Sequence, residues 1–232
     1  MDISLSLHTG DGQPGDATHP HTADIRTPRG RAEAARAHVQ AGGNPFLLLA
    51  GPLLRALADF GAPQTSPPGP IAELHDLLHQ EVQLFTQLCD QLNLRRDHML
   101  AARYALCTFL DESAANTPWG DKVWAQRSLL VQFHNEAWGG EKFFQLLGKL
   151  AENPAAHRNL LELFYLILSL GFEGRYRVQQ NGRAQLASVR ERLAQMLSKE
   201  RGDVIHELSP AWQTTARPAR PLRESVPLWA AA

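Results

Sequence analysis

Two adjacent carboxylates, Asp111 and Glu112, stand at the end of a predicted helix beside a loop that contains proline and glycine. Such a pair can act as general acid and base or bind a divalent metal ion. The same groups can instead pair with arginine or cap the free N–H groups of a following helix. The sequence shows no nucleophile and no matching set of metal ligands near them, so we expect a binding or structural role.

The segment FHNEAWGGEKFF (133–144) carries the most enzyme-like group of side chains, His134, Glu136 and Glu141. Combined with the acidic pair, His134 and Glu136 would form the centre of a metal-dependent hydrolase, which stays open as the alternative function. The spacings match no established ligand motif, so we expect neither a metal ion nor another cofactor.

Within the same segment, Trp138, Gly139 and Gly140 predict a tight corner between two helices. Glycine supplies the backbone freedom that such a corner needs. Glu141 would then lie in the first turn of the second helix, where the helix dipole favours a negative charge. We therefore expect the whole segment, from His134 to Glu141, to be structural.

Two further motifs also favour packing over chemistry. His75 and His79 have a spacing that suits two metal ligands on one helix, but the HExxH pattern is absent, so surface or groove histidines are expected. The segment GFEGRYR (171–177) follows no predicted strand and differs from GxGxxG, which excludes a nucleotide loop. Its Arg175 and Arg177 are expected to pair with acidic residues of this chain or of a partner.

The composition indicates an all-α protein. The chain has 35 leucines against 13 valines and isoleucines together, a bias toward helix formers. Its two cysteines, Cys89 and Cys107, fall in leucine-rich stretches and are expected to be buried free thiols. A formal net charge of −1 lacks the basic excess of a nucleic-acid-binding protein, so nucleic acid is not expected as a partner.

Apolar periodicity predicts seven to eight helices in two small packed bundles between residues 44 and 208. Asn44 and Pro45 suit an N-cap and a first helical position, and Gly51–Pro52 is expected to kink or split the helix that follows. The run LLELFYLILSL (160–170) is apolar almost all round and is expected at the centre of the core. The predicted helices span residues 44–60, 71–92, 97–112, 121–134, 140–151, 154–171 and from 182 onward.

The two ends of the chain differ from this helical body. Residues 1–43 are rich in glycine, proline and polar residues and are expected to be a disordered tail, with at most a short helix near 31–40. Residues 209–232 bring arginines, then Trp229 and small apolar residues, which is the order found on entering a membrane from the cytoplasmic side, although an ordinary frayed tail fits the composition equally well. No cleavable signal is visible, and the longest uncharged apolar run in the body (163–172) is too short to span a bilayer.

Several of these motifs together resemble those of the DotU/IcmH family, whose type VI secretion members are called TssL. The resemblance covers about residues 44–208. Its most specific parts are the FHNE-x-WGGE-x-FF and GFEGRY blocks, and NPFLLLAGPLL (44–54) is similar to the family's usual opening. The other matching segments are CTFLDE (107–112), PWG (118–120), SLL (128–130) and LELFYLILSLGFEGRYRV (161–178).

The resemblance implies a hook-shaped cytoplasmic domain of two helical bundles with a cleft between them. A juxtamembrane linker (209–232) and a single C-terminal transmembrane helix beyond Ala232 are implied to follow it. The implied function is that of a non-enzymatic inner-membrane subunit, which joins the large membrane subunit TssM and docks the baseplate, chiefly TssK, so that a contractile tail can assemble. A homodimer helped by the membrane helix is implied as well.

The resemblance also assigns Asp111 and Glu112 to partner binding at the cleft, where they would orient a basic partner surface. Replacing both by lysine is then expected to abolish baseplate binding without changing helicity or melting. The GFEGRY block is expected to be architectural, with glycines for a turn, an arginine in an internal ion pair and a packed tyrosine. Its residues are Gly171, Gly174, Arg175 and Tyr176.

Overall fold

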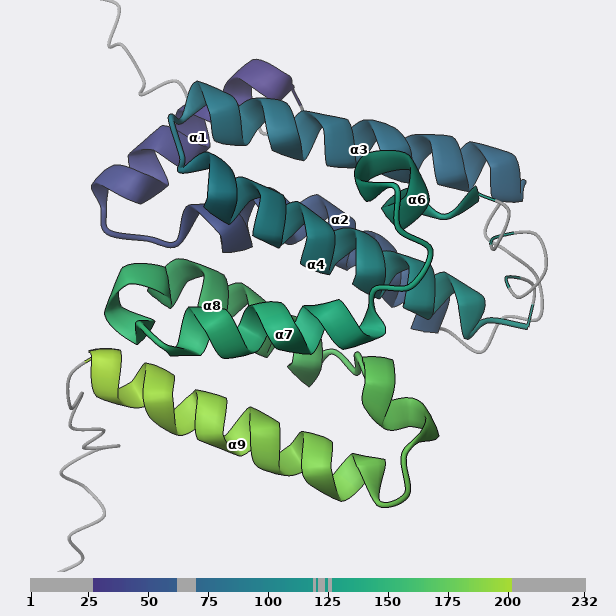
Figure 1. Cartoon of the computed structure of the whole chain (residues 1–232). Coiled ribbons are helices and arrows are strands. Elements are labelled where there is room, and N and C mark those ends of the chain that lie inside the picture. Colours follow the sequence, from purple (N-terminus) through teal and green to yellow (C-terminus); the bar gives the residue numbers. More distant parts are fainter. Residues whose placement is uncertain (1–26, 62–69, 119, 121–123, 125–126, 202–232) are drawn as a thin grey trace, which may run out of the picture.

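The computed structural model describes residues 27–61, 70–118, 120, 124 and 127–201, and its helices are stacked in layers (Figure 1). The described residues form α-helices and a 3-10 helix and contain no strand, so the all-α prediction is confirmed. No helix in this part of the chain is long and apolar enough to cross a membrane. The elements are α1 (Pro28–Gln40), α2 (Pro45–Gly61), α3 (Ile71–Gln91), α4 (Arg96–Ala115), α6 (Leu129–His134), α7 (Gly140–Ala151), α8 (Pro154–Ser169), η2 (Gly174–Val178) and α9 (Gly182–Arg201).

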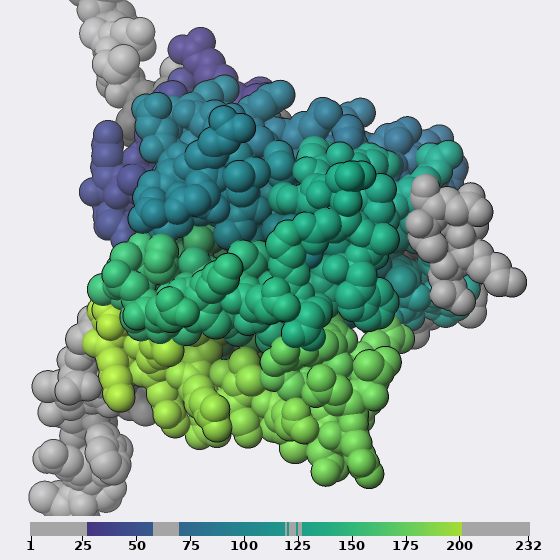
Figure 2. Space-filling model, viewed as in Figure 1, coloured from purple at the N-terminus to yellow at the C-terminus, as the bar shows by residue number. Residues whose placement is uncertain are grey.

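The helices fall into two groups that meet along α4 and α8. In Figure 1, α1 and α3 form one outer side, α2 and α4 lie beneath them, α7 and α8 follow, and α9 forms the opposite side. α8 contacts α2, α4, α7 and α9. The space-filling view shows the light green segment of η2 and α9 packed directly under the green segment of α7 and α8 (Figure 2). Both groups share one hydrophobic core cluster.

Helix α8 lies at the centre of this core, as its apolar sequence predicts. Leu160, Phe164 and Ile167 are each 0% exposed. The ring of Phe143 on α7 stacks on Phe164 with centroids 4.6 Å apart. A helix that is apolar on nearly every side is stable only where other helices cover it, and α8 is covered in that way.

The start of α2 is fixed by Asn44, which caps the helix and ties it to α8. The Asn44 Oδ1 atom accepts a hydrogen bond from Phe46 N at 2.9 Å, which satisfies one of the free N–H groups of the first turn. The Asn44 Nδ2 atom donates to Asn159 O at 2.8 Å and to Glu162 Oε2 at 2.9 Å. The helix then runs on through Pro52 as a single element, so the expected split does not occur there.

Residues 28–40 of the expected tail form α1, so the short helix allowed near residues 31–40 is present and begins at Pro28. This helix contacts α2 and α3. It buries Ala32 and Ala35, and its Arg31 guanidinium pairs with Glu81 of α3, with a shortest distance of 2.6 Å. Alanines carry little hydrophobic signal, so this segment looks polar in the sequence although its contact face is small and apolar. The rest of the predicted tail, residues 1–26, lies outside the described residues.

One other boundary differs from the sequence-based expectation. The helix expected over residues 121–134 is described only as α6, which begins at Leu129 because Ser128 caps it by accepting a hydrogen bond from Val131 N at 3.2 Å. Residues 121–123 and 125–126 lie outside the described residues, as does the expected linker at 209–232. Cys89 and Cys107 are buried free thiols, as expected, and burial raises the pKa of Cys89 to about 12.

Enlarging Ala35 tests the docking of α1 in solution. The side chain is 0% exposed, so Ala35→Leu must overpack the contact and should lower the free energy of unfolding by about 1–3 kcal/mol. Chemical denaturation followed by circular dichroism measures this change. Ala37→Leu, at an exposed position of the same helix, is the matched control. Equal stabilities of the two variants would mean that α1 does not dock.

Candidate functional site

The acidic pair is at the C-terminal end of α4, and the Asp111 carboxylate is fully occupied within the chain. Its Oδ1 atom accepts hydrogen bonds from Trp124 Nε1 at 2.8 Å and Leu129 N at 2.9 Å. Its Oδ2 atom accepts from Ser128 Oγ at 2.7 Å and Leu130 N at 2.8 Å. A carboxylate offers about four acceptor sites, so Asp111 is saturated. It caps the N-terminus of α6, the second role that such a pair can have.

The neighbouring Glu112 holds a different segment, the turn before η2. Its Oε1 atom accepts a hydrogen bond from Glu173 N at 2.8 Å, and its Oε2 atom accepts from Gly174 N at 2.9 Å. Burial raises the pKa of Glu112, while these two N–H groups and the nearby Arg177 act in the opposite direction. The ionised form is therefore partly desolvated and depends on its donors.

The two carboxylates thus join α4 to the start of α6 and to the turn before η2. Replacing both by lysine would leave buried N–H groups without acceptors, so unchanged melting of that double variant is no longer expected. The assignment of Asp111 and Glu112 to partner binding concerns a contact outside this chain and stays a prediction. Within the chain, each carboxylate holds a neighbouring segment to α4 by hydrogen bonds.

The corner between α6 and α7 packs tightly because of its glycines. A Cβ atom on Gly139 would lie 2.3 Å from Thr108 Oγ1, and one on Gly140 would lie 3.1 Å from the Gly174 backbone. Any larger side chain would push α7 away from α4 and η2. Glu141 follows in the first turn of α7, in keeping with the expected helix start.

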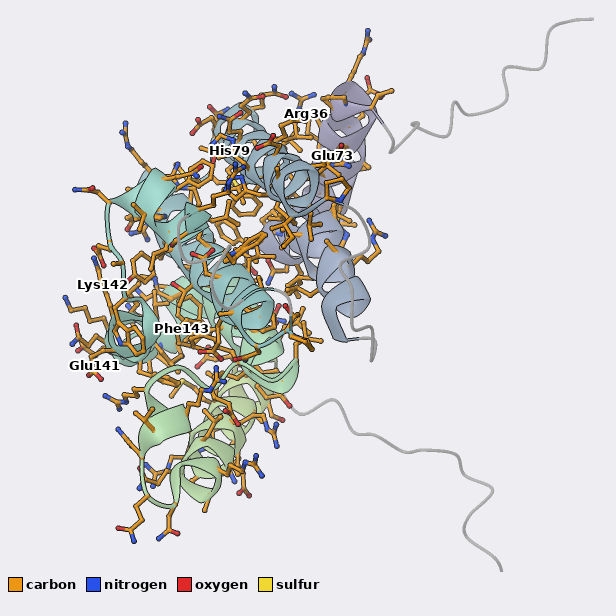
Figure 3. The ribbon with its side chains drawn as sticks, turned by 90° about the vertical axis from the view of Figure 1, so that its right-hand side faces the viewer. Arg36, Glu73, His79, Glu141, Lys142 and Phe143 are labelled. Atoms are coloured by element: carbon orange, nitrogen blue, oxygen red, sulfur yellow. The ribbon has the colours of Figure 1, made fainter. Side chains whose placement is uncertain are left out.

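Figure 3 shows how the beginning of α7 divides its side chains between solvent and core. Glu141 and Lys142 lie at the outer edge of the molecule, whereas Phe143 lies on the inner side and is 0% exposed. The aromatic side chain anchors α7, and the two charged side chains remain available for ion pairs with neighbouring segments.

The GFEGRY turn needs its glycines for conformation and for space. Gly171 and Gly174 have positive φ angles of 107° and 52°, a region that side-chain-bearing residues rarely adopt. A Cβ atom on Gly174 would also lie 2.9 Å from the Phe172 ring and 3.0 Å from Gly140 O. The turn is therefore fitted closely against the corner between α6 and α7.

After the turn, Arg175 and Tyr176 fasten η2 to α7. Arg175 Nη1 and Glu141 Oε1 are 2.8 Å apart, and the guanidinium lies over the Phe144 ring at 5.2 Å. The buried Tyr176 ring meets Phe144 edge-on, with centroids 4.8 Å apart. These contacts are in keeping with the expected internal ion pair and packed tyrosine.

His134 and Glu136 lie in a separate cluster with Tyr104, Arg103 and Lys142. Arg103 Nε donates to His134 Nε2 at 3.4 Å, and burial followed by the Arg103 charge lowers the pKa of His134 to about 4. Tyr104 donates its hydroxyl hydrogen to Glu136 at 2.9 Å. The Lys142 ammonium also bonds Glu136 and holds the pKa of that carboxyl below its usual range.

The four residues of the hydrolase alternative therefore do not converge. The acidic pair faces α6 and the turn before η2, whereas His134 and Glu136 bind Arg103 and Tyr104. In the described part of the chain, no group of three or more His, Cys, Asp or Glu residues could hold a metal ion. No observation favours metal-assisted hydrolysis at these residues.

The histidine pair on α3 is packed rather than free. His75 is 4% exposed and meets the Trp124 ring edge-on at 5.6 Å. The expectation of a surface or groove position is therefore wrong for His75. His79 stacks on Phe133 at 4.8 Å, so α3 uses both imidazoles to cover α6 and the segment before it.

Between the acidic pair, the α6–α7 corner and η2 lies a groove of about 290 Å³. Its lining includes Asp111, Glu112 and the apolar side chain of Leu130. This groove is the strongest candidate for a functional surface, because the two specific sequence blocks meet there. Its other lining residues are Thr108, Ala115, Trp124, Ser128, Ala137, Trp138, Gly139, Gly140, Gly174, Arg177 and Val178.

Trp138 does not pack into the corner, as a structural role would require, but is 71% exposed at the groove. Val178 is 81% exposed at the same groove, and it was missed by sequence reasoning, as was Thr108 beneath Gly139. The sequence offers no signal for Val178, because an exposed valine at the end of a short helix resembles any surface residue.

Comparison with known proteins shows which family this chain resembles. A model of the family described as Type VI secretion system protein DotU matches residues 45–232. The crystal structure of TssL from Vibrio cholerae is 35% identical with a TM-score of 0.62, and the alignment covers 68% of this chain and 97% of that one. The cytoplasmic domain of TssL from Acinetobacter baumannii shares the fold at 20% identity and a TM-score of 0.61, covering 67% and 98%. A search of curated proteins found no significant match.

The capping role of Asp111 predicts a loss of stability in Asp111→Asn. The amide has one oxygen acceptor in place of two and would turn an NH₂ group toward N–H donors, so the free energy of unfolding should fall by about 2–4 kcal/mol. Urea denaturation of the purified protein measures the change. Asp90→Asn, at an exposed position of α3, is the control. If the two variants were equally stable, the four hydrogen bonds of Asp111 would have no net energetic value.

The half-buried His134 predicts a pH dependence of folding. Its pKa is lowered from 6.5 to about 4 in the fold, so the unfolded chain takes up a proton at higher pH than the folded chain. The free energy of unfolding should therefore fall as the pH drops from about 6.5 toward about 4. His134→Gln keeps an acceptor for Arg103 and removes this titration, so its stability should fall less than that of the wild type. Parallel stability profiles over this range would contradict the prediction.

Proposed function

Because the chain belongs to the DotU family of type VI secretion system proteins, we propose that it is a non-enzymatic structural subunit of the secretion membrane complex. In this role it anchors the cytoplasmic baseplate and the contractile tail to the bacterial inner membrane through protein–protein contacts. The observation that carries the proposal is the family match, which begins at the first residue of α2 and includes every later described helix.

The proposed partners are the large inner-membrane subunit TssM and the baseplate, chiefly its subunit TssK. The described helices lie on the cytoplasmic side, and a single-pass anchor holds them at the membrane. A homodimer is the proposed self-associated form. The layered fold suits this role, since a subunit that transmits force needs rigid packing between its contact surfaces.

The use of the reactive side chains supports a structural role over catalysis. Asp111 accepts four hydrogen bonds and Glu112 accepts two from within the chain. His134 and Glu136 are engaged by Arg103, Tyr104 and Lys142. Side chains that are hydrogen-bonded within the chain in this way stabilise the fold. A catalytic group, in contrast, must be able to exchange protons or ligands with a substrate.

Tail assembly in the source bacterium tests this proposal. A strain without the gene should form no contractile sheaths, and the full-length gene should restore them, as seen with a fluorescent sheath subunit. Affinity purification of the restored protein should recover TssM and TssK. Sheaths in the deletion strain, or recovery of neither partner, would overturn the structural assignment.

A double variant separates the structural role from the hydrolase alternative. His134→Gln with Glu136→Gln keeps hydrogen-bond acceptors for Arg103 and Tyr104 but removes the imidazole and the carboxylate. We expect normal sheath assembly, because the proposed role uses no chemistry at these residues. If the folded double variant accumulated to the wild-type level but assembled no sheaths, catalysis at these side chains would become the better explanation.

A further inference from the structure

The rim of the groove exposes two large apolar side chains. Trp138 is 71% exposed and Val178 is 81% exposed, and both line the same cavity. They come from different elements, the α6–α7 corner and the end of η2. Aromatic side chains at the edge of an apolar hollow are the residues that most often dominate protein–protein binding energy. The rim therefore has the composition of a binding surface.

The hydrogen-bonding groups that remain available at this groove differ from what the acidic pair suggests. The Asp111 carboxylate has no acceptor site left, and Glu112 is bound by two backbone N–H groups. Arg177, in contrast, is exposed at the rim, where it donates to Asn116. Among the described residues, no carboxylate lies within ion-pair distance of Arg177. Both carboxylates keep their negative charge, and Arg177 is near enough to Glu112 to lower the pKa of that carboxyl. Arg177 is therefore distinguished by its exposed hydrogen-bond donors, and not by a net positive charge of the groove.

The neighbouring arginine shows that this state is particular to Arg177. Arg175, two residues earlier, pairs with Glu141 at 2.8 Å and lies over the Phe144 ring. In GRYR, Arg175 is therefore bonded within the chain, whereas Arg177 is exposed to solvent. A guanidinium with free donors is best satisfied by a carboxylate, which can accept two parallel hydrogen bonds.

We propose that this groove binds a partner protein segment that inserts a bulky apolar side chain beside Trp138 and places a carboxylate on Arg177. The proposal rests on the structural function proposed above and specifies the chemistry of the baseplate or membrane subunit that the chain docks. A hollow of about 290 Å³ falls just below the range of about 300–1,000 Å³ that is usual for small-molecule sites. It suits individual side chains better than a cofactor.

A membrane surface fits these observations less well than a protein segment. Recognition of anionic lipids usually depends on clusters of about four to eight lysines and arginines. Arg177 is the single cationic side chain among the described residues that line the groove. Trp138 and Val178 beside a hollow instead suit a protein segment that inserts an apolar side chain between them.

Binding of the full-length chain to purified TssK and TssM, measured by interferometry, tests the groove. Trp138→Ala should weaken the complex at least about tenfold. Arg177→Glu should weaken it more than Arg177→Gln does, because the former repels a carboxylate and the latter only loses the ion pair. The matched controls are Leu77→Ala, 60% exposed on α3, and Arg190→Glu, exposed on α9. Both should bind as the wild type does, and thermal melting verifies that all variants fold.

A charge exchange identifies the partner's carboxylate. Overlapping peptides of the bound partner should locate a segment with an apolar residue next to Asp or Glu. Changing that acid to lysine should abolish binding to the wild type and restore binding to Arg177→Glu. If no acidic peptide behaves in this way, or if Arg177→Glu tightens the complex, the partner surface is not acidic and the proposal is wrong.

The remaining outcomes separate this proposal from the proposed function. If the wild type binds a partner and Trp138→Ala and Arg177→Glu bind equally well, the groove proposal fails while the structural function stands. If these two variants lose flotation with vesicles of phosphatidylglycerol and phosphatidylethanolamine but keep partner binding, the surface is a lipid one and the proposal is overturned. If the wild type binds neither partner, the proposed function fails and the groove proposal falls with it.

Discussion

The fold around the groove depends on the satisfaction of buried N–H groups by two adjacent carboxylates. Asp111 receives the free donors at the start of α6, and Glu112 receives two donors from the turn before η2. Consecutive positions on a helix point about 100° apart, so neighbouring side chains can hold segments on different sides. Without these acceptors, the desolvated N–H groups of both segments would disfavour the folded arrangement.

These hydrogen bonds help to explain why the FHNEAWGGEKFF block and the GFEGRY block lie together although they are separate in the sequence. The glycines of the α6–α7 corner and of the GFEGRY turn allow their backbones to approach within van der Waals distance. Arg175 and Glu141 then link the two blocks across their outer edge. The carboxylates are half-buried in this arrangement and bonded within the chain, and the exposed side chains at the groove include Trp138, Val178 and Arg177.

The acidic pair and Trp138 show how the surroundings of a side chain depend on distant segments. Two carboxylates beside a loop could act in catalysis, pair with arginine or cap a helix, and in the fold their oxygens accept hydrogen bonds from backbone donors. A tryptophan before two glycines predicts a packed corner, yet the corner closes through Gly139 against Thr108 and leaves the indole outside. Burial of a side chain depends on the segment that covers it, and that segment is often distant in the sequence.

The sequence by itself determined the helical class, most helix limits, the central position of α8, the buried cysteines and the family resemblance. Each of these follows from local composition, apolar periodicity or short motifs, which the chain carries regardless of its fold. Tertiary structure alone decided that residues 28–40 dock as α1, that the acidic pair accepts hydrogen bonds from other segments of the chain and that Trp138, Val178 and Arg177 are exposed at the groove. These features depend on contacts between separate segments, such as Asp111 with Leu129, Arg31 with Glu81 and Glu112 with Gly174, and no local pattern specifies which distant donor a carboxylate will meet.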